Sequence, residues 1–393
     1  MERWIWADAE PREVAEWALG APPLPVSPEG DLADGGYDDL AVAWLARMLS
    51  PAAGLHDKLT WFWHGHWTSG ASKVGEARLL HRQHLVLRPH ALGSFRDLAH
   101  DLTVDAAMLL WLDGDPSSGD APNENYAREL MELFTLGRGN YTEADVRAGA
   151  LALAGWEVDQ GKVRFDPDRA HRGEVSFLGR RGRLDAHDVV DLVCDHPACA
   201  SFVAAKLHTY LVGAPPSPGR LEELAGLFRG RGLQIEPLVR AILLHDDFLA
   251  ADARHARPRS PLEWWVAAYA AGAARRDRRA ERSGDDGDGE LSAWPLRQLD
   301  QMPFDPPNVA GWPQSPAWVS STQVLTRTRL VANLELAPLD WPSAPAAAQR
   351  ASLVEVSPST AAALDAAEQV EDEWERAWGL RAVALLSPEF ALA

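Results

Sequence analysis

The sequence predicts a mainly α protein, a multi-helix globular array with a small β-hairpin and long irregular loops. Apolar residues recur at helical spacing in most segments of the 393-residue chain. Alternation of apolar and polar residues is confined to one stretch, where Val163 and Phe165 precede a loop and Val175 and Phe177 follow it. This pattern indicates one two-stranded hairpin or paired extended segment. Links rich in Pro, Gly or charge separate the helical segments.

Helical periodicity divides the chain into two expected regions. An N-terminal region covers residues 1–184 and a C-terminal region covers 185–393, or the two form one continuous domain. Residues 275–290 are charged and Gly-rich without apolar anchors, and we interpret them as a mobile linker. The expected helices are 10–19, 37–49, 55–66, 73–87, 94–103, 104–112, 123–137, 142–156, 186–194, 197–212, 220–229, 236–244, 261–274, 292–301, 323–334 and 372–386.

Composition limits the classes of function. A formal net charge of −19 argues against general binding of nucleic acid or of an anionic membrane. Cys194 and Cys199 are too few for a disulfide framework and the wrong count for a cysteine-based zinc site, so we expect both to be reduced. No apolar run approaches the length of a membrane span, and the N-terminus lacks a secretory pattern. A cytoplasmic protein is therefore expected.

The segment 123–137 has the densest polar face of the chain. Asn123 is expected to cap a helix and Gly137 to end it. One interpretation is a ladder of ordinary ion pairs between residues four apart. The other is a site at the helix N-terminus, where Arg128 would orient a carboxylate or bind an anionic substrate. The ligand-capable side chains of the first two turns are Glu124, Asn125, Arg128 and Glu129.

Histidines supply the candidate metal ligands. On a regular helix His64 and His66 would face different directions, whereas in extended backbone both could bind one metal, and Gly65 makes extended backbone plausible. Otherwise they are histidines at a helix end, one packed among tryptophans and one capping carbonyls. His171 lies in the loop 165–172 and is a candidate third ligand or a solvated side chain.

An aromatic, Pro-rich loop near residue 310 is the last feature of note. Trp312 and Trp318 could wall a cleft or lock this loop onto the helices, and locking is the favoured role. The sequence contains no phosphate-binding P-loop, no dinucleotide fingerprint, no nucleophile elbow and no His-Glu-x-x-His pattern. Nucleotide hydrolases, Rossmann enzymes, serine hydrolases and zincins therefore lose support.

Five motifs together resemble the bacterial "domain of unknown function 1800" family. The likeness runs from about the first helices to Leu334, and the Asn-Glu-Asn helix is its most specific part. The motifs are Phe62-Trp63-His64-Gly65-His66, Pro122-Asn-Glu-Asn-Tyr-Ala-Arg-Glu-Leu-Met-Glu-Leu-Phe-Thr-Leu-Gly137, Tyr141 to Val146, Gly155-Trp156 and Phe304-Asp-Pro-Pro-Asn-Val-Ala-Gly-Trp312.

The resemblance implies little about activity, because that family has no assigned one. Lys206 lies where the family carries a lysine before its second half. Relatives have a His-Asp-x-Gly-like loop, and here the aspartate is replaced in Ala170-His171-Arg172-Gly173. Members commonly carry export signals, and the N-terminal residues of this sequence do not predict one.

We expect an enzyme whose cleft is lined by His64, His66, His171 and the polar face of residues 124–129. A divalent metal would be zinc, iron, manganese or copper. Glu129 or Glu124 would ligate it or act as general base, with Arg128 fixing an anionic group of an unknown small molecule.

Two alternatives remain open. One is a non-catalytic scaffold or partner protein, in which the polar motifs form a buried network and Arg128→Ala costs several kcal/mol. The other is a heme-binding protein, since histidines among aromatic rings can ligate iron.

Overall fold

The computed structural model describes residues 11–21, 35–50, 53–115, 117–250, 253, 256–273, 291–313, 315–333, 341–353 and 356–392. Helices make up most of the secondary structure in these ranges, which confirms the mainly α class. The expected linker at 275–290 lies outside the described residues.

Side-chain caps precede the later helices of the first half, α6 to α9. Ser94 and Asp105 each cap the helix that follows with a side-chain oxygen. The predicted cap at Asn123 is confirmed, because its Oδ1 accepts the N–H of Tyr126 at 3.1 Å. The elements are α1 (Pro11–Gly20), α2 (Tyr37–Met48), α3 (Leu55–His66), α4 (Ala71–Val74), α5 (Ala77–His90), α6 (Phe95–Thr103), α7 (Ala106–Trp111), α8 (Glu124–Glu129), a π-helical turn (Leu130–Thr135) and α9 (Glu143–Ala152).

Two expected single helices are divided in the structure. The segment 73–87 falls into α4 and α5, because Gly75 has φ 76° and ends α4 in the left-handed region. The segment 123–137 begins as α8 and continues as the π-helical turn. A sequence pattern of helical period does not distinguish these hydrogen-bond registers.

The expected pairing of Val163 and Phe165 with Val175 and Phe177 is wrong. Each pair belongs to a separate antiparallel hairpin with its own partner strand. The strands are β1 (Trp156–Asp159) with β2 (Lys162–Phe165), and β3 (Val175–Phe177) with β4 (Arg180–Gly182).

Local turns explain this pairing. Gln160 and Gly161 have φ of 49° and 72°, and Leu178 and Gly179 have φ of 45° and 83°. Two consecutive residues with positive φ make the tight turn that matches the twist of a hairpin. Each strand therefore pairs with its immediate neighbour rather than across the longer loop.

The second half adds helices that extend the body at both sides. Four of them, α14, α19, α20 and α22, lie in segments that were not expected to be helical. The elements are α10 (Ala186–Asp195), α11 (Pro197–Val212), α12 (Pro218–Gly230), α13 (Ile235–Leu243), α14 (Asp246–Leu249), α15 (Pro261–Ala273), α17 (Trp294–Gln298), a 3₁₀ turn (Ser315–Trp318), α18 (Ser321–Asn333), α19 (Ala344–Arg350), α20 (Pro358–Glu368), α21 (Glu373–Leu386) and α22 (Pro388–Ala391).

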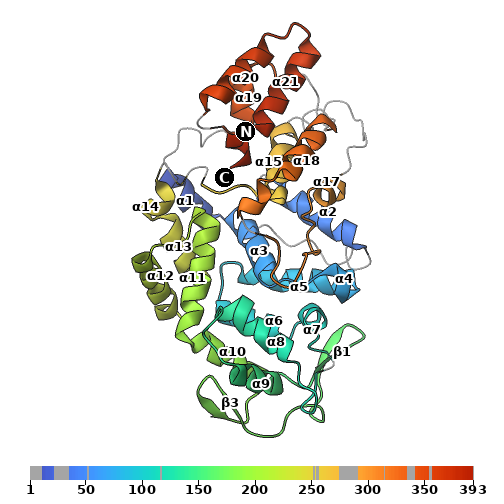
Figure 1. The fold of residues 1–393 in the computed structure, drawn as a ribbon, viewed down its shortest axis with the longest axis vertical. Helices are drawn as coiled ribbons and strands as arrows, with labels where there is room; N and C mark the ends of the chain where they lie inside the picture. Colours follow the sequence, from blue (N-terminus) through green and yellow to red (C-terminus); the bar gives the residue numbers. More distant parts are fainter. Residues whose placement is uncertain are drawn as a thin grey trace.

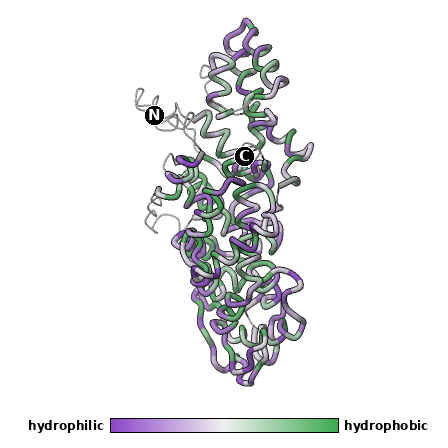
Figure 2. Tube along the Cα trace, turned by 90° about the vertical axis from the view of Figure 1, so that its left-hand side faces the viewer, coloured by the Kyte–Doolittle hydropathy of each residue, from purple (hydrophilic) through white to green (hydrophobic). Residues whose placement is uncertain are grey.

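These elements form an elongated body. The α19, α20 and α21 helices lie at one end, and the strands β1 and β3 lie at the other (Figure 1). In Figure 2 hydrophobic stretches run through the interior and many hydrophilic stretches follow the outline. No described helix is both long and apolar enough to span a membrane.

One cluster of buried apolar side chains runs through both halves, from Ala15 to Phe390. Contacts also cross the expected boundary between residues 184 and 185, because α10 packs on α6 and α9. The division into two regions stays a prediction.

Asp145 links α9 to the second hairpin. Removing its side chain is therefore expected to destabilise the protein more than removing the capping side chain of Thr142. Its carboxylate accepts the N–H of Thr142 and the N–H of Leu178, both at 2.9 Å. We expect Asp145→Ala to lower the free energy of unfolding by about 2 kcal/mol, against about 1 kcal/mol for Thr142→Ala. Urea unfolding followed by circular dichroism measures both. Equal losses would show that the bond to Leu178 contributes nothing.

Candidate functional site

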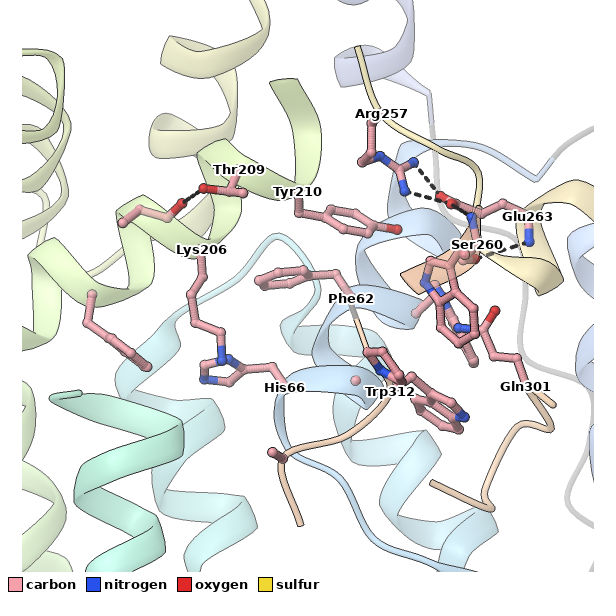
Figure 3. A pocket seen from close by; sticks show the side chains of 17 residues that line it. Phe62, His66, Lys206, Thr209, Tyr210, Arg257, Ser260, Glu263, Gln301 and Trp312 are labelled. Carbon is pink, nitrogen blue, oxygen red and sulfur yellow. Dashed lines mark hydrogen bonds and ion pairs between the residues drawn. The ribbon is translucent and has the colours of Figure 1, made fainter. Parts of the chain in front are cut away.

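A cavity of about 390 Å³ opens between α3, α11, the start of α15 and the loop before α18 (Figure 3). This volume is in the usual range for small-molecule sites. Aromatic rings form much of the wall: Trp61, Phe62, Phe202, Tyr210, Trp312 and Trp318.

The aromatic rings come from three elements and pack in pairs. Ring centroids of Trp61 and Trp312 are 5.1 Å apart, and those of Phe62 and Tyr210 are 5.0 Å apart. Trp312 and Trp318 are both buried and both line the cavity. Both tryptophans therefore wall a cleft, which was the less favoured of the two interpretations from the sequence.

The expectation of extended backbone at Gly65 is wrong, because α3 continues to His66. His64 and His66 therefore point to different sides of one helix, as residues two apart must. From the end of this helix, His66 donates from Nε2 to the carbonyl of Phe134 at 2.8 Å.

His64 anchors the aromatic loop. Its Nε2 accepts the N–H of Phe304 at 3.1 Å, and its ring lies 5.4 Å from that of Trp312. Burial lowers the pKa of His64 to about 3, so the ring is neutral at physiological pH. The close approach of this loop to α3 requires glycine at position 311, because a Cβ there would lie 2.5 Å from the carbonyl oxygen of Gly65.

The π-helical turn after α8 supplies carbonyl groups that bind two side chains of the cavity wall. The N–H of Leu136 returns five residues to the carbonyl of Met131 at 2.7 Å, so the turn is wider than an α-helix. The carbonyl of Leu133 accepts Lys206 Nζ at 3.3 Å, and that of the adjacent Phe134 accepts His66. Two side chains of the cavity wall are thereby fixed by neighbouring peptide groups.

Lys206 is half-buried, and it is the charged residue of the cavity lining that has no acidic partner among the described residues. Its side chain runs from α11 toward the ring of His66 (Figure 3), and its Nζ lies 5.0 Å from the centroid of the Phe202 ring. Burial lowers the pKa of Lys206 to about 8. The amine is therefore mostly protonated at pH 7 and poorly solvated.

The opposite wall carries a satisfied ion cluster. Arg257 donates to both oxygens of Glu263 at 2.7 Å, and Lys58 Nζ lies 3.0 Å from the same carboxylate. Burial alone would raise the pKa of Glu263, but Lys58 and Arg257 hold it well below its usual range. Arg257 and Glu263, the other charged residues of the lining, pair with each other, so Lys206 is the one charged lining residue without a partner of opposite charge in the described chain.

The polar face of 123–137 lies outside this cavity. Arg128 forms a two-pronged ion pair with Glu143 of α9, at 2.6 and 2.8 Å, instead of pairing within its own helix. Glu124 and Asn125 are exposed, and none of the four predicted catalytic side chains lines the cavity. Glu129 is half-buried, and burial followed by the charge of Glu132 raises its pKa.

The candidate metal ligands are not brought together. His171 lies beside Gly119 in the loops near the hairpins, where a Cβ on that glycine would be 3.0 Å from the Cα of the histidine. Within the described ranges no group of three or more His, Cys, Asp or Glu side chains could hold a metal ion. Metal binding stays a prediction from the sequence.

Comparison with family models matches residues 21–392 to a family described as a protein of unknown function, DUF1800. The chain belongs to the DUF1800 family. No curated protein and no solved structure matches it. The whole cavity wall lies inside the part of the chain that matches the DUF1800 model.

Some cavity residues of this DUF1800 chain carried a sequence signal and others did not. His66, Lys206 and Trp312 belong to the segments on which the resemblance rests. Arg257 and Glu263 were missed, because one acidic and one basic residue six apart at a helix start give no distinctive pattern.

The ion pair between Arg128 and Glu143 is expected to contribute little to stability. Their side chains are 33% and 62% exposed, so solvent screens the pair. We expect a double-mutant cycle of Arg128→Ala and Glu143→Ala to give a coupling energy of about 0.5 kcal/mol. Urea unfolding of the four proteins measures it. A coupling of several kcal/mol would restore the buried-network interpretation.

The stability contribution of Lys206 is expected to depend on pH. Its folded pKa of about 8 lies below the ordinary value of 10.5, so the unfolded chain binds more protons between these values. The free energy of unfolding of the unchanged protein therefore increases, relative to that of Lys206→Met, as pH rises from about 8 to 10.5. Denaturant titrations at about pH 7 and about pH 10 measure the change. Lys162→Met, at an exposed strand position, is the control and should show no such trend.

Proposed function

We propose that this chain binds a small organic anion with a flat or apolar body in the cavity, with Lys206 as its counter-ion. The observation that carries the proposal is a positively charged amine, poorly solvated and without an acidic partner among the described residues, in an aromatic pocket. A buried charge is costly unless it is paired, so an anionic ligand would stabilise this site.

Charge supports this choice of ligand. The chain as a whole carries a formal net charge of −19, yet the charged lining residues are Lys206 and the mutually paired Arg257 and Glu263. An acidic protein repels anions from its surface in general. A locally positive cavity in such a protein is therefore a specific feature of the site.

The aromatic wall supports the flat or apolar body. Rings from α3, α11 and the aromatic loop offer faces for stacking and apolar contact.

Matched carboxylate and amide probes test the proposal. Benzoate, phenylacetate and indole-3-acetate should bind saturably in isothermal titration calorimetry at about pH 7, below the pKa of Lys206. Their neutral amides should bind at least about tenfold more weakly, because a charge-assisted hydrogen bond is lost.

Two variants complete the test. Lys206→Met should reduce carboxylate binding to the level of the amides, whereas Lys162→Met should leave it unchanged. If no carboxylate binds, or if the amides bind equally well, the proposal fails. Retention of full affinity by a folded Lys206→Met protein would also overturn it.

A further inference from the structure

The surroundings of Lys206 suit a reactive amine as well as a counter-ion. Its Nζ donates to the carbonyl oxygen of Leu133 at 3.3 Å, and no described carboxylate lies within ion-pair distance. A carbonyl can accept from an ammonium or from a neutral amine, whereas a carboxylate would hold the group protonated much more strongly. The neutral amine thus keeps its anchor and retains a free lone pair.

Poor solvation adds to this effect. Phe202 covers one side of the amine, with its ring centroid 5.0 Å from Nζ, and burial favours the uncharged form. Lysines desolvated in this way are the ones that act as nucleophiles toward carbonyl groups. By contrast, Lys58 on α3 is bound to Glu263 at 3.0 Å and is held in its charged form.

His66 is a neutral neighbour of Lys206 in the same wall, because burial, followed by the charge of Lys206, lowers its pKa well below the usual range. Because its Nε2 donates to Phe134, the proton of the neutral ring is on Nε2 and the lone pair is on Nδ1. Nδ1 is buried and has no hydrogen-bond partner in the described chain. The carbonyls of Leu133 and Phe134 belong to adjacent residues, so Lys206 and His66 are held close together by one backbone turn.

We infer that Lys206 is a catalytic nucleophile that forms an imine with an aldehyde or ketone bound in the cavity. The inference rests on the proposed function in placing a small molecule beside Lys206. It adds the substrate class, a carbonyl compound whose body fits between the aromatic rings.

The reaction balances without any further reagent. The neutral Nζ attacks the carbonyl carbon, a C–N bond forms, and the carbonyl electron pair moves to oxygen. One proton passes from nitrogen to oxygen, which gives a carbinolamine with one N–H and one hydroxyl group. The remaining N–H proton passes to this hydroxyl group, which leaves as water when the nitrogen lone pair forms the C=N bond. One amine and one carbonyl compound give one imine and one water.

Reductive trapping tests the inference on the full chain. Phenylacetaldehyde is added with sodium cyanoborohydride, which reduces an imine to a stable secondary amine, and peptide mass spectrometry locates the adduct. We expect labelling of Lys206 at least about tenfold faster than that of exposed lysines such as Lys162, because its neutral fraction is larger. Labelling spread evenly over surface lysines would overturn the inference.

Lys206→Arg is the decisive variant. Arginine keeps the positive charge and a donor for Leu133, but it remains protonated and does not form an imine. This variant should lose the rapid adduct, whereas Lys162→Met should retain it. A rapid adduct that persists elsewhere in the cavity of Lys206→Arg contradicts the assignment.

The two proposals fail separately. Carboxylate binding without a rapid Lys206 adduct would overturn imine formation and leave the anion site intact. A rapid Lys206 adduct without carboxylate binding would overturn the anion site and support the reactive amine.

Discussion

Two neutral histidines at the end of α3 hold the cavity together. A neutral imidazole has one donor and one acceptor nitrogen, and the structure uses a different one in each ring. His64 accepts the N–H of Phe304 and fixes the aromatic loop, whereas His66 donates to Phe134 and fixes the π-helical turn. Burial keeps both rings uncharged, so both connections persist at physiological pH. The positions of Trp312 and Lys206 depend on these two bonds.

The helix of residues 123–137 contributes to the cavity through its backbone rather than its charged face. Its side chains pair outward, as in the ion pair of Arg128 with Glu143 on α9. Its last turn widens to a π-helix and directs two carbonyls toward α3 and α11. Turns of this kind occur often at functional sites because they free backbone groups from the helical ladder.

Charge is distributed in this protein so that the cavity differs from the rest of the molecule. Arg257 and Lys58 neutralise Glu263 on one wall, and an isolated amine faces aromatic rings on the other. A small molecule in the cavity would therefore be held at two ends, with one end stacked on the aromatic rings and the other bound to the nitrogen of Lys206. Such a division is typical of sites that fix the orientation of a ligand.

The sequence by itself determined the helical class, the caps at Asn123 and Thr142 and the family, because periodicity, capping and motif spacing are local properties. It also singled out His66, Lys206 and Trp312 as parts of motifs. Only the tertiary structure decided that these residues share one cavity and that Glu129 does not line it. The reason is physical: the bonds that assemble the cavity run to backbone carbonyls and N–H groups, which every residue carries and no sequence pattern marks.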